Sequence, residues 1–236
     1  MSLRGQASTE GQPIASGSVS PSQSMVAVAC RDHVEIFNMG IGDGIISKHE
    51  SINLSRQEGN FTVTDVSWSP HDADLVAGSA TNGQIAVMRV DTRKDNDQTH
   101  IALKWEARED SKRAVNRVNW HPNHRSILIS ASHNSNVRLW DIRSKAVEPC
   151  IATYNPRTEA CRDVQVCPTN DNLLAAVFEN GNLAIWDQRY PDAALNQITA
   201  HTGVALAVKW CPTVPGMLAT GGRDKTVKIW DMNKVR

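Results

Sequence analysis

The chain has 236 residues, of which 40% are hydrophobic, and its 25 basic residues balance its 25 acidic residues. This length is enough for one large domain. The zero net charge provides no overall field that would attract a nucleic acid or an anionic membrane, so neither is expected as a partner. The sequence also lacks a run of about 18 apolar residues, which predicts that no helix inserts into a membrane.

The N-terminal segment and the cysteines both indicate an intracellular protein. The first 24 residues are rich in Ser, Gly and Gln and contain no apolar stretch of the kind that a secretion signal needs. The five cysteines form no Cys-x-x-Cys pair. We therefore expect buried thiols in a reducing compartment.

One pattern of residues recurs along the chain. A strand that ends near a proline is followed by a short apolar strand, a tight turn and a strand that ends in Trp-Asp or a substitute. The closing aromatic residue, or its substitute, recurs every 44 to 52 residues, at Phe37, Met88, Trp140, Trp186 and Trp230. Propeller blades of the WD40-repeat type recur about every 40–45 residues. Inserts such as the charged segment 91–99, expected to be a solvated loop, account for the excess.

Each repeat predicts three clear strands and a weaker fourth. The turn between the second and third strands needs residues that tolerate a left-handed backbone. These turns are Asn82-Gly83, Asn134-Ser135, Asn180-Gly181 and Asp224-Lys225. The outer strands are expected near residues 45–54, 100–105, 146–153 and 193–199. In the last repeat, Met217–Gly221 should be buried on both faces, and Val227 and Ile229 should point inward, with Lys228 outward.

These features predict an all-β fold, a WD40-repeat β-propeller with about five blades. A β-sandwich also has many short strands, but it does not predict the same motifs in the same order each time. Propellers with this signature commonly have seven blades, so we expect a ring that is incomplete, with the last blade lacking its outer strand. A polar tail at 1–12 precedes the propeller at 13–236. The expected blades are 13–60, 61–110, 111–155, 156–199 and 200–236.

The last repeat holds a set of polar residues that can form a buried hydrogen-bonded tetrad: His201, Thr220, Asp224 and Trp230. Buried polar groups must find partners, and such a tetrad fixes a strand against a loop. A general-base pair of His201 and Asp224 is the alternative, and the structural role is favoured. The other aromatic residues that seal the blades are Trp68, Trp120, Trp140, Trp186 and Trp210.

Motifs for chemistry are weak in this sequence. Gly221–Thr226 resembles a phosphate-binding loop, but two of its glycines are missing and no helix follows. The run Gly40–Gly44 also lacks a following helix and is expected to be a flexible loop. The His121-x-x-His124 pair has no third ligand in view, so we expect no metal ion and no cofactor. The chain is therefore predicted not to be an enzyme.

A propeller without catalytic motifs is expected to bind protein partners through its loops. The candidate residues lie at the turns between second and third strands and beside the first strands. They are Asn82, Arg117, His133, Arg162, Phe178, Glu179 and Arg223. Phe178 is the strongest candidate, because an aromatic side chain at a hairpin turn suits a binding hot spot. Its alternative role is packing against the next blade.

Several segments resemble a known family. They include Phe178–Asn182, Trp186–Asp192, Thr199–His201 and Leu218–Lys225. Over residues 51–232 the chain resembles the N-terminal propeller of a WD-repeat subunit of the SEA/GATOR coat-like complex. The resemblance implies a non-enzymatic scaffold that works with other WD-repeat and coat-like subunits. It also implies a cytoplasmic location beside the vacuolar or lysosomal membrane, and positive regulation of TORC1 amino-acid signalling.

A second interpretation rests on two tetrapeptides of the form Trp-Asp-x-Arg, at 140–143 and 186–189. In WD40 substrate receptors of cullin-RING ubiquitin ligases this tetrapeptide contacts the ligase adaptor, so Arg143 and Arg189 would be the contact residues. The simpler explanation is a repeat ending that happens to place an arginine there.

Overall fold

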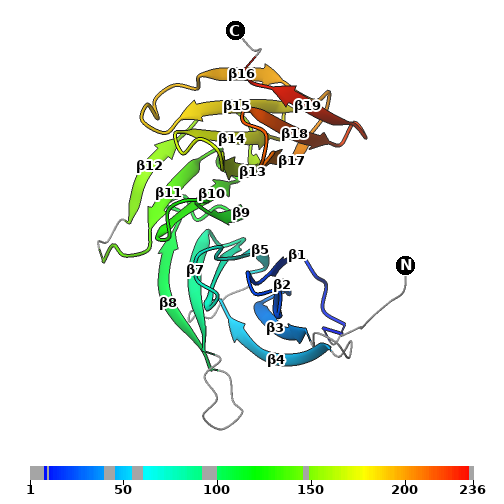
Figure 1. Ribbon diagram of the computed structural model, residues 1–236, viewed down its shortest axis with the longest axis vertical. Helices are drawn as coiled ribbons and strands as arrows, with labels where there is room; N and C mark the ends of the chain where they lie inside the picture. Colours follow the sequence, from blue (N-terminus) through cyan, green and yellow to red (C-terminus); the bar gives the residue numbers. More distant parts are fainter. Residues whose placement is uncertain are drawn as a thin grey trace. The chain divides into compact units, whose positions relative to one another are not determined.

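The computed structural model describes residues 8–9, 11–39, 46–54, 61–91, 100–145 and 149–233, and within these ranges every regular element is a strand (Figure 1). None of the described segments forms a helix with the length and apolar character needed to cross a membrane. The expected polar tail (1–12), glycine run (40–44) and charged loop (91–99) fall wholly or largely outside the described residues.

The strands form five antiparallel sheets in chain order. Sheet 1 contains β1 (Ser16–Val19), β2 (Met25–Ala29), β3 (His33–Met39) and β4 (Ile46–Asn53). Sheet 2 contains β5 (Val63–Trp68), β6 (Leu75–Ala80), β7 (Gln84–Asp91) and β8 (His100–Arg108). Sheet 3 contains β9 (Val115–Trp120), β10 (Ile127–Ser132), β11 (Val137–Asp141) and β12 (Cys150–Tyr154).

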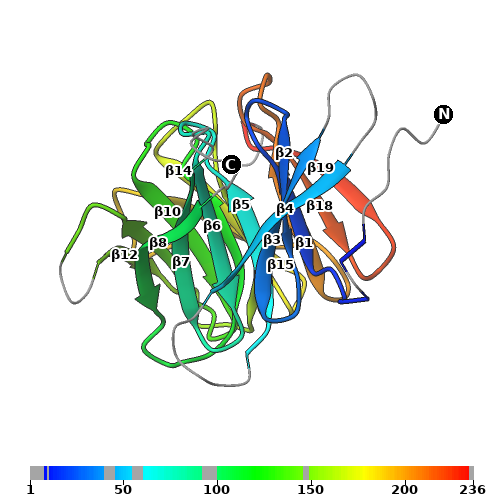
Figure 2. The same ribbon diagram turned by 90° about the horizontal axis from the view of Figure 1, so that it is seen from below.

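Sheet 4 contains β13 (Cys161–Val166), β14 (Leu173–Phe178), β15 (Asn182–Asp187) and β16 (Asn196–Thr199). Sheet 5 contains β17 (Ala205–Trp210), β18 (Met217–Gly222) and β19 (Val227–Asp231). In every sheet the strands lie in sequence order. Figure 1 shows this order in sheet 4, and Figure 2 shows β6 and β7 side by side in sheet 2. The predicted outer strands are confirmed as β4, β8, β12 and β16, although residues 45 and 146–148 lie outside the described residues.

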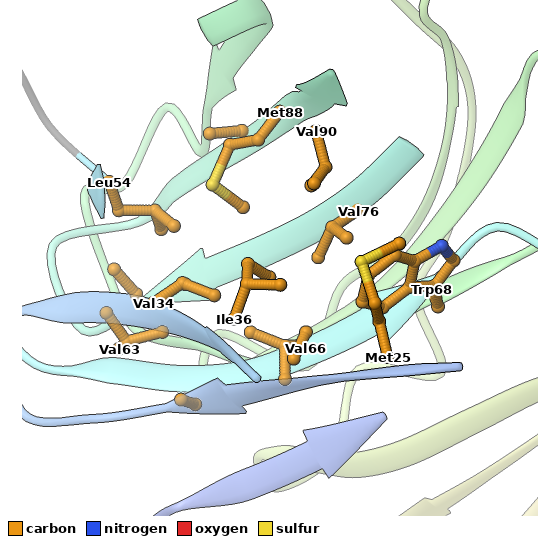
Figure 3. Close-up of a cluster of buried hydrophobic side chains, with 14 residues drawn as sticks. Met25, Val34, Ile36, Leu54, Val63, Val66, Trp68, Val76, Met88 and Val90 are labelled. Atoms are coloured by element: carbon orange, nitrogen blue, oxygen red, sulfur yellow. The ribbon is translucent and has the colours of Figure 1, made fainter. Parts of the chain in front are cut away.

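The chain divides into two compact units, Met1–Trp120 and His121–Arg236, here called unit 1 and unit 2. The core of unit 1 lies between sheets 1 and 2. Met25, Val34 and Ile36 meet Val66, Trp68 and Val76 there (Figure 3), and the side chains of Leu54 and Met88 also belong to the cluster. Val34 and Ile36 of β3, and Val66 and Trp68 of β5, stand at alternate positions, as expected when one face of each strand is buried.

Unit 2 has two such cores. One contains Ile129 and Leu139 with Val164, Phe178 and Trp186. The other contains the opposite face of sheet 4, including Leu183 and Ile185, with Val208, Trp210 and Leu218 of sheet 5. Sheet 4 is therefore buried on both faces, which explains why β14 and β15 are almost uniformly apolar.

A buried aspartate joins the first strands of neighbouring sheets. In unit 1, Asp65 Oδ2 accepts a 3.0 Å hydrogen bond from the backbone N–H of Val118. In unit 2, Asp163 Oδ2 accepts a 2.9 Å bond from the N–H of Val208. These contacts satisfy inward-facing N–H groups that no neighbouring strand of their own sheet can reach. The same strands are also joined by indole N–H groups, since Trp120 donates to the carbonyl of Ser67 and Trp210 to that of Gln165.

The expected burial of the last repeat is wrong in two respects. Val227 and Ile229 are 74% and 64% exposed, whereas Lys228 is half-buried and its Nζ donates to the carbonyl of Ala200. Only Leu218 and Thr220 of β18 are buried, so this strand is covered on one face. In sheet 4, the equivalent strand β15 has Leu183 and Ile185 covered by residues of sheet 5. In sheet 5, no described element packs on the face that carries Val227 and Ile229, so these side chains are exposed.

We predict that Asp163→Ala lowers the free energy of unfolding by about 1–3 kcal/mol, because the buried N–H of Val208 loses its acceptor. Equilibrium urea unfolding of the purified chain measures the change. The matched control is Asp192→Ala, at an exposed aspartate, which should change stability by less than about 0.5 kcal/mol. Equal effects of the two substitutions would show that the Asp163 contact does not hold the sheets together.

Candidate interaction surface

The hairpin turns between the second and third strands share one geometry. In each turn the side-chain Oδ1 of Asn82, Asn134, Asn180 or Asp224 accepts a 3.1 Å hydrogen bond from the N–H two residues later. The residue that follows each of them has a positive φ, between 65° and 85°. The predicted turns are therefore confirmed. Asn and Asp stabilise such turns because their short side chains bond the local backbone.

In unit 2 these hairpin ends lie side by side along one edge. Ser135 and Asn180 both donate a side-chain hydrogen bond to Thr158, one to its carbonyl and one to its hydroxyl. The carbonyl of Gly181 then accepts from the N–H groups of Ala200 and His201, at 2.9 and 3.0 Å. A Cβ at position 181 would collide with the carbonyl oxygen of His201, so this contact requires a glycine. We call this edge the hairpin edge; it consists of residues 133–135, 179–181 and 223–225.

The proposed partner-binding residues occupy different environments at the hairpin ends. His133 and Arg223 are exposed on the hairpin edge. Arg162 and Glu179 form an ion pair with each other, and both are partly buried. These four side chains give unit 2 a polar edge with two exposed cationic or polar groups available to a partner.

In unit 1, the remaining two candidates are more constrained. Asn82 forms its turn and is half-buried. The guanidinium of Arg117 donates to Asp65 Oδ1 at 3.2 Å, and the Asp65 side chain is only 4% exposed. Arg117 therefore contributes to the contact between the first strands of sheets 2 and 3, and its side chain is still 34% exposed.

The expectation that Phe178 is an exposed hot spot is wrong. Its side chain is fully buried, and its ring meets that of Trp186 edge-on at a centroid distance of 6.3 Å. Phe178 ends β14, so it lies one residue before the turn and still points into the core with Val164 and Leu139. Its alternative role, packing between blades, is the one that the structure shows.

The four residues of the predicted tetrad come together in sheet 5. His201 Nδ1 lies 3.0 Å from Asp224 Oδ1, and its Nε2 lies 2.9 Å from Thr220 Oγ1. Trp230 Nε1 donates to the same Thr220 hydroxyl at 2.9 Å. Because an indole can only donate, the Thr220 hydroxyl accepts there and donates to His201 Nε2, and Nδ1–H then donates to Asp224.

The tetrad is closed to substrate. His201 is 1% exposed, and both of its ring nitrogens are within hydrogen-bond distance of a partner. Burial raises the pKa of Asp224, but hydrogen bonds from the side chain and N–H of Thr226 and from His201 outweigh it, so that the pKa lies well below its usual range. An ionised Asp224 next to a buried imidazole is here a structural acceptor.

The other sealing aromatics are placed in two ways. Trp68, Trp120 and Trp210 end the first strands, and each donates its indole N–H to a backbone carbonyl. Trp140 on β11 donates to Ser130 Oγ at 2.9 Å. Trp186 on β15 instead packs edge-on against Tyr154 and Phe178. All five are buried, the most exposed being Trp120 at 6%.

The arginines of the two Trp-Asp-x-Arg tetrapeptides fold back on their own aspartates. Arg143 Nη2 lies 2.8 Å from Asp141 Oδ2, and Arg189 Nη2 lies 2.6 Å from Asp187 Oδ2. The Arg189 hydrogen bonds lower the pKa of Asp187 to about 2. Both guanidiniums remain exposed at their outer side, with side-chain exposures of 73% and 61%. They are thus accessible, but each already has an anionic partner.

A cavity of about 560 Å³ lies in unit 2 beside the first of these arginines. Its lining includes His121, His124, Arg125 and Arg143, with Ile127 and Ile151 as apolar walls. His121 Nδ1 accepts from the N–H groups of Asn123 and His124, so this histidine is used by the turn that it begins. The sequence analysis considered His121 and His124 only as a pair of metal ligands, and it did not predict the cavity that both residues line.

The family model described as MIOS, WD40 repeat, matches residues 94–236, which is more than half of the chain. The chain belongs to this WD40-repeat family. Among solved structures, a chain in the crystal structure of the mitotic checkpoint complex superposes with a TM-score of 0.73 at 22% identity, and covers 92% of this chain and 61% of that one. This likeness shows the fold alone. Together the two findings confirm the predicted all-β WD40 propeller fold.

The relatives agree with the resemblance seen in the sequence. GATOR2 complex protein WDR24 of Xenopus laevis is 36% identical over 220 residues, which is 93% of this chain and 27% of that protein. GATOR2 complex protein WDR24 of Homo sapiens is 34% identical over 210 residues, or 89% of this chain and 24% of that protein. The chain thus spans about a quarter of the length of these curated relatives.

We predict that His201→Ala lowers the free energy of unfolding by about 1–3 kcal/mol, because the buried Thr220 hydroxyl loses the acceptor of its proton and Asp224 loses the imidazole N–H as a donor. Denaturant unfolding measures it. His133→Ala is the control, because that side chain is exposed and its loss should cost less than about 0.5 kcal/mol. If His201→Ala unfolds at the same denaturant concentration as the wild type, the stabilising role of the tetrad is refuted.

We also predict a pH dependence for Asp224. Its pKa in the folded chain lies below the ordinary value of 3.8, so its stabilising contribution is complete above that value and is lost as the pH falls through the lowered pKa. The stability difference between wild type and Asp224→Asn should therefore be constant near neutral pH and shrink in strong acid. Urea unfolding from about pH 7 to about pH 2.5 tests this, with Asp192→Asn as the control. A difference that stays constant over the whole range would contradict the assignment.

Proposed function

We propose that this chain is the propeller part of a non-enzymatic scaffold subunit of the GATOR2 complex. The observation that carries the proposal is its 36% identity, over 93% of its length, to GATOR2 complex protein WDR24. By the resemblance described above, such a subunit promotes TORC1 signalling when amino acids are plentiful and works at the vacuolar or lysosomal surface. The partners of this chain are then other protein subunits of the complex.

The structure supports a binding platform in two ways. Thr158 bridges two hairpin ends of unit 2, and Gly181 bonds His201, which in turn bonds Asp224 of the third hairpin, so these loops are held in fixed positions. Exposed His133 and Arg223 stand on these rigid turns and lose little conformational freedom of the backbone on binding. Residues that bind partners commonly lie on loops that a rigid scaffold holds in position.

Two observations favour a scaffold over the other interpretations. The His201–Asp224 pair, which most resembles a catalytic arrangement, is buried inside a bonded tetrad. The ligase-receptor alternative needs Arg143 and Arg189 for an adaptor, but both are engaged by their own aspartates, and the comparisons favour the GATOR2 interpretation.

The proposal is tested by tagging the full-length protein at its own locus and identifying the proteins that co-purify with it. Other GATOR2 subunits should be recovered in near-equal amounts, and depletion of the protein should weaken phosphorylation of TORC1 substrates after amino-acid refeeding. Recovery of a cullin adaptor in place of GATOR2 subunits would overturn the proposal.

We predict that Arg223→Glu reduces the recovery of partner subunits about 5–30-fold while the melting temperature stays unchanged. The residue is exposed, so its charge is available to a partner and is not needed by the core. Arg143→Glu is the matched control at the exposed arginine of the first Trp-Asp-x-Arg tetrapeptide. If Arg143→Glu lowers recovery and Arg223→Glu does not, the binding surface lies beside the cavity and not at the hairpin edge.

A further inference from the structure

The β2–β3 hairpin of unit 1 gathers three side chains of the kinds that bind transition metals. Ligand atoms of Cys30, His33 and Glu35 all lie within 4.8 Å of one another. Cys30 is fully buried, and the side chain of Glu35 is only 2% exposed. A thiol, an imidazole and a carboxylate are donor types of transition-metal sites, and here two of the three are shielded from water.

The register of the hairpin explains why these three residues meet. Ala29 pairs with Val34 and Val28 with Glu35, and the N–H of Cys30 donates to the carbonyl of His33 at 3.0 Å. Cys30 and His33 are therefore opposite each other, and Glu35 follows two residues later on the same face. Val34 and Ile36, at the alternate positions, point to the other face and into the core (Figure 3).

The imidazole of His33 is held in a specific orientation. Its Nδ1 lies 2.6 Å from Asp32 Oδ1, and its Nε2 lies 3.0 Å from Glu35 Oε1. A histidine that ligates a metal commonly gives its other ring N–H to a carboxylate, which fixes the tautomer and makes the ligand nitrogen more basic. Asp32 stands in the position of that outer carboxylate, and Nε2 is directed to Glu35.

We infer that Cys30, His33 and Glu35 form a zinc-type metal site that fastens the β2–β3 hairpin, with Asp32 supporting His33. A thiolate, an imidazole and a carboxylate are the three ligand types that Zn²⁺ takes in proteins, with bonds of about 2.0–2.3 Å. A tetrahedral ion with such bonds holds its ligands about 3.3–3.8 Å apart. Atoms within 4.8 Å of one another reach that spacing by small side-chain rotations.

The alternative to a metal ion at the Cys30–His33–Glu35 site is a bound proton. Burial lowers the pKa of His33, but its hydrogen bonds to Asp32 and Glu35 outweigh it and raise the pKa overall. On binding, Zn²⁺ replaces this proton and the proton of the Cys30 thiol, and both pass to the solvent. The two occupants are therefore distinguished by a direct metal titration and not by geometry.

The experiment uses the purified full-length chain, stripped with a chelator and titrated with Co²⁺ as a spectroscopic probe and then with Zn²⁺. We expect one Co²⁺ per chain with a thiolate-to-metal charge-transfer band, its displacement by Zn²⁺, and a higher melting temperature with Zn²⁺. Cys30→Ser should weaken binding by more than about 100-fold, and Asp32→Asn by about 10–100-fold. X-ray absorption of the zinc-loaded wild type, which needs no variant, should show one sulfur and otherwise nitrogen or oxygen ligands.

The matched control is Cys211→Ser. Cys211 is partly exposed, and the hydrogen bond from Thr213 lowers the pKa of its thiol, so it is the natural competitor for adventitious metal. Binding in this variant should equal that of wild type. The inference is overturned if the wild type shows no thiolate band. It is also overturned if Cys211→Ser removes the band, or if folded Cys30→Ser and Glu35→Gln bind as wild type does.

Discussion

Aspartate side chains that bond the backbone of the next sheet are the contacts on which the arrangement of each unit depends. The first strand of a sheet has neighbours on one side only, so half of its N–H groups face away from the ladder and need another acceptor. Asp65 and Asp163 supply it to Val118 and Val208, from a buried position. Sheet packing by apolar area alone is non-directional. These hydrogen bonds add direction, and so they set which residue of one sheet stands opposite which residue of the next.

The function proposed for the chain follows from this fixed registration. The hairpins between the second and third strands lie near these contacts, because Asp65 pairs with Ser79 and Asp163 pairs with Val177, so holding the first strands together also fixes the spacing of the hairpins. In unit 2, Thr158 bridges the turns at Ser135 and Asn180, and the carbonyl of Gly181 holds the segment of Ala200 and His201. A surface built from short turns that are bonded to one another presents exposed side chains such as Arg223 in constant positions. This is the property that a scaffold subunit needs when it must bind several partners at once.

Structural features that depend only on residues adjacent in the sequence, such as the hairpin turns, were predictable. Features that depend on the opposing sheet, such as the burial of a side chain, were not. The turn at Asn180-Gly181 needs only an acceptor side chain and a residue with positive φ, so its local signature is sufficient. Phe178 stands next to the same turn, but whether it is buried depends on Val164 and Trp186. The exposure of Val227 likewise depends on what covers sheet 5. The Asp-Val pairs at 65–66 and 163–164 carried a signal for the contact between sheets, but only the structure shows which N–H they bond.

The sealing aromatic of each blade is matched to one residue on the second strand, and this pair explains why the repeat tolerates so much variation. In four sheets this second-strand residue lies diagonally across from the closing residue, two positions beyond its direct register partner: Gly78 for Met88, Ser130 for Trp140, Ala176 for Trp186 and Thr220 for Trp230. A hydroxyl at this place accepts the indole N–H in two of them. Where the partner is Ala176, the ring packs against Phe178 and Tyr154 instead. Where the aromatic is replaced by Met88, a Cβ at Gly78 would lie 2.6 Å from Leu54 Cδ1, so the neighbouring leucine occupies that space. These four sheets therefore fill the equivalent place in three ways, by a hydroxyl–indole hydrogen bond, by aromatic packing or by Met88 with Leu54, so a tryptophan is not needed in every sheet.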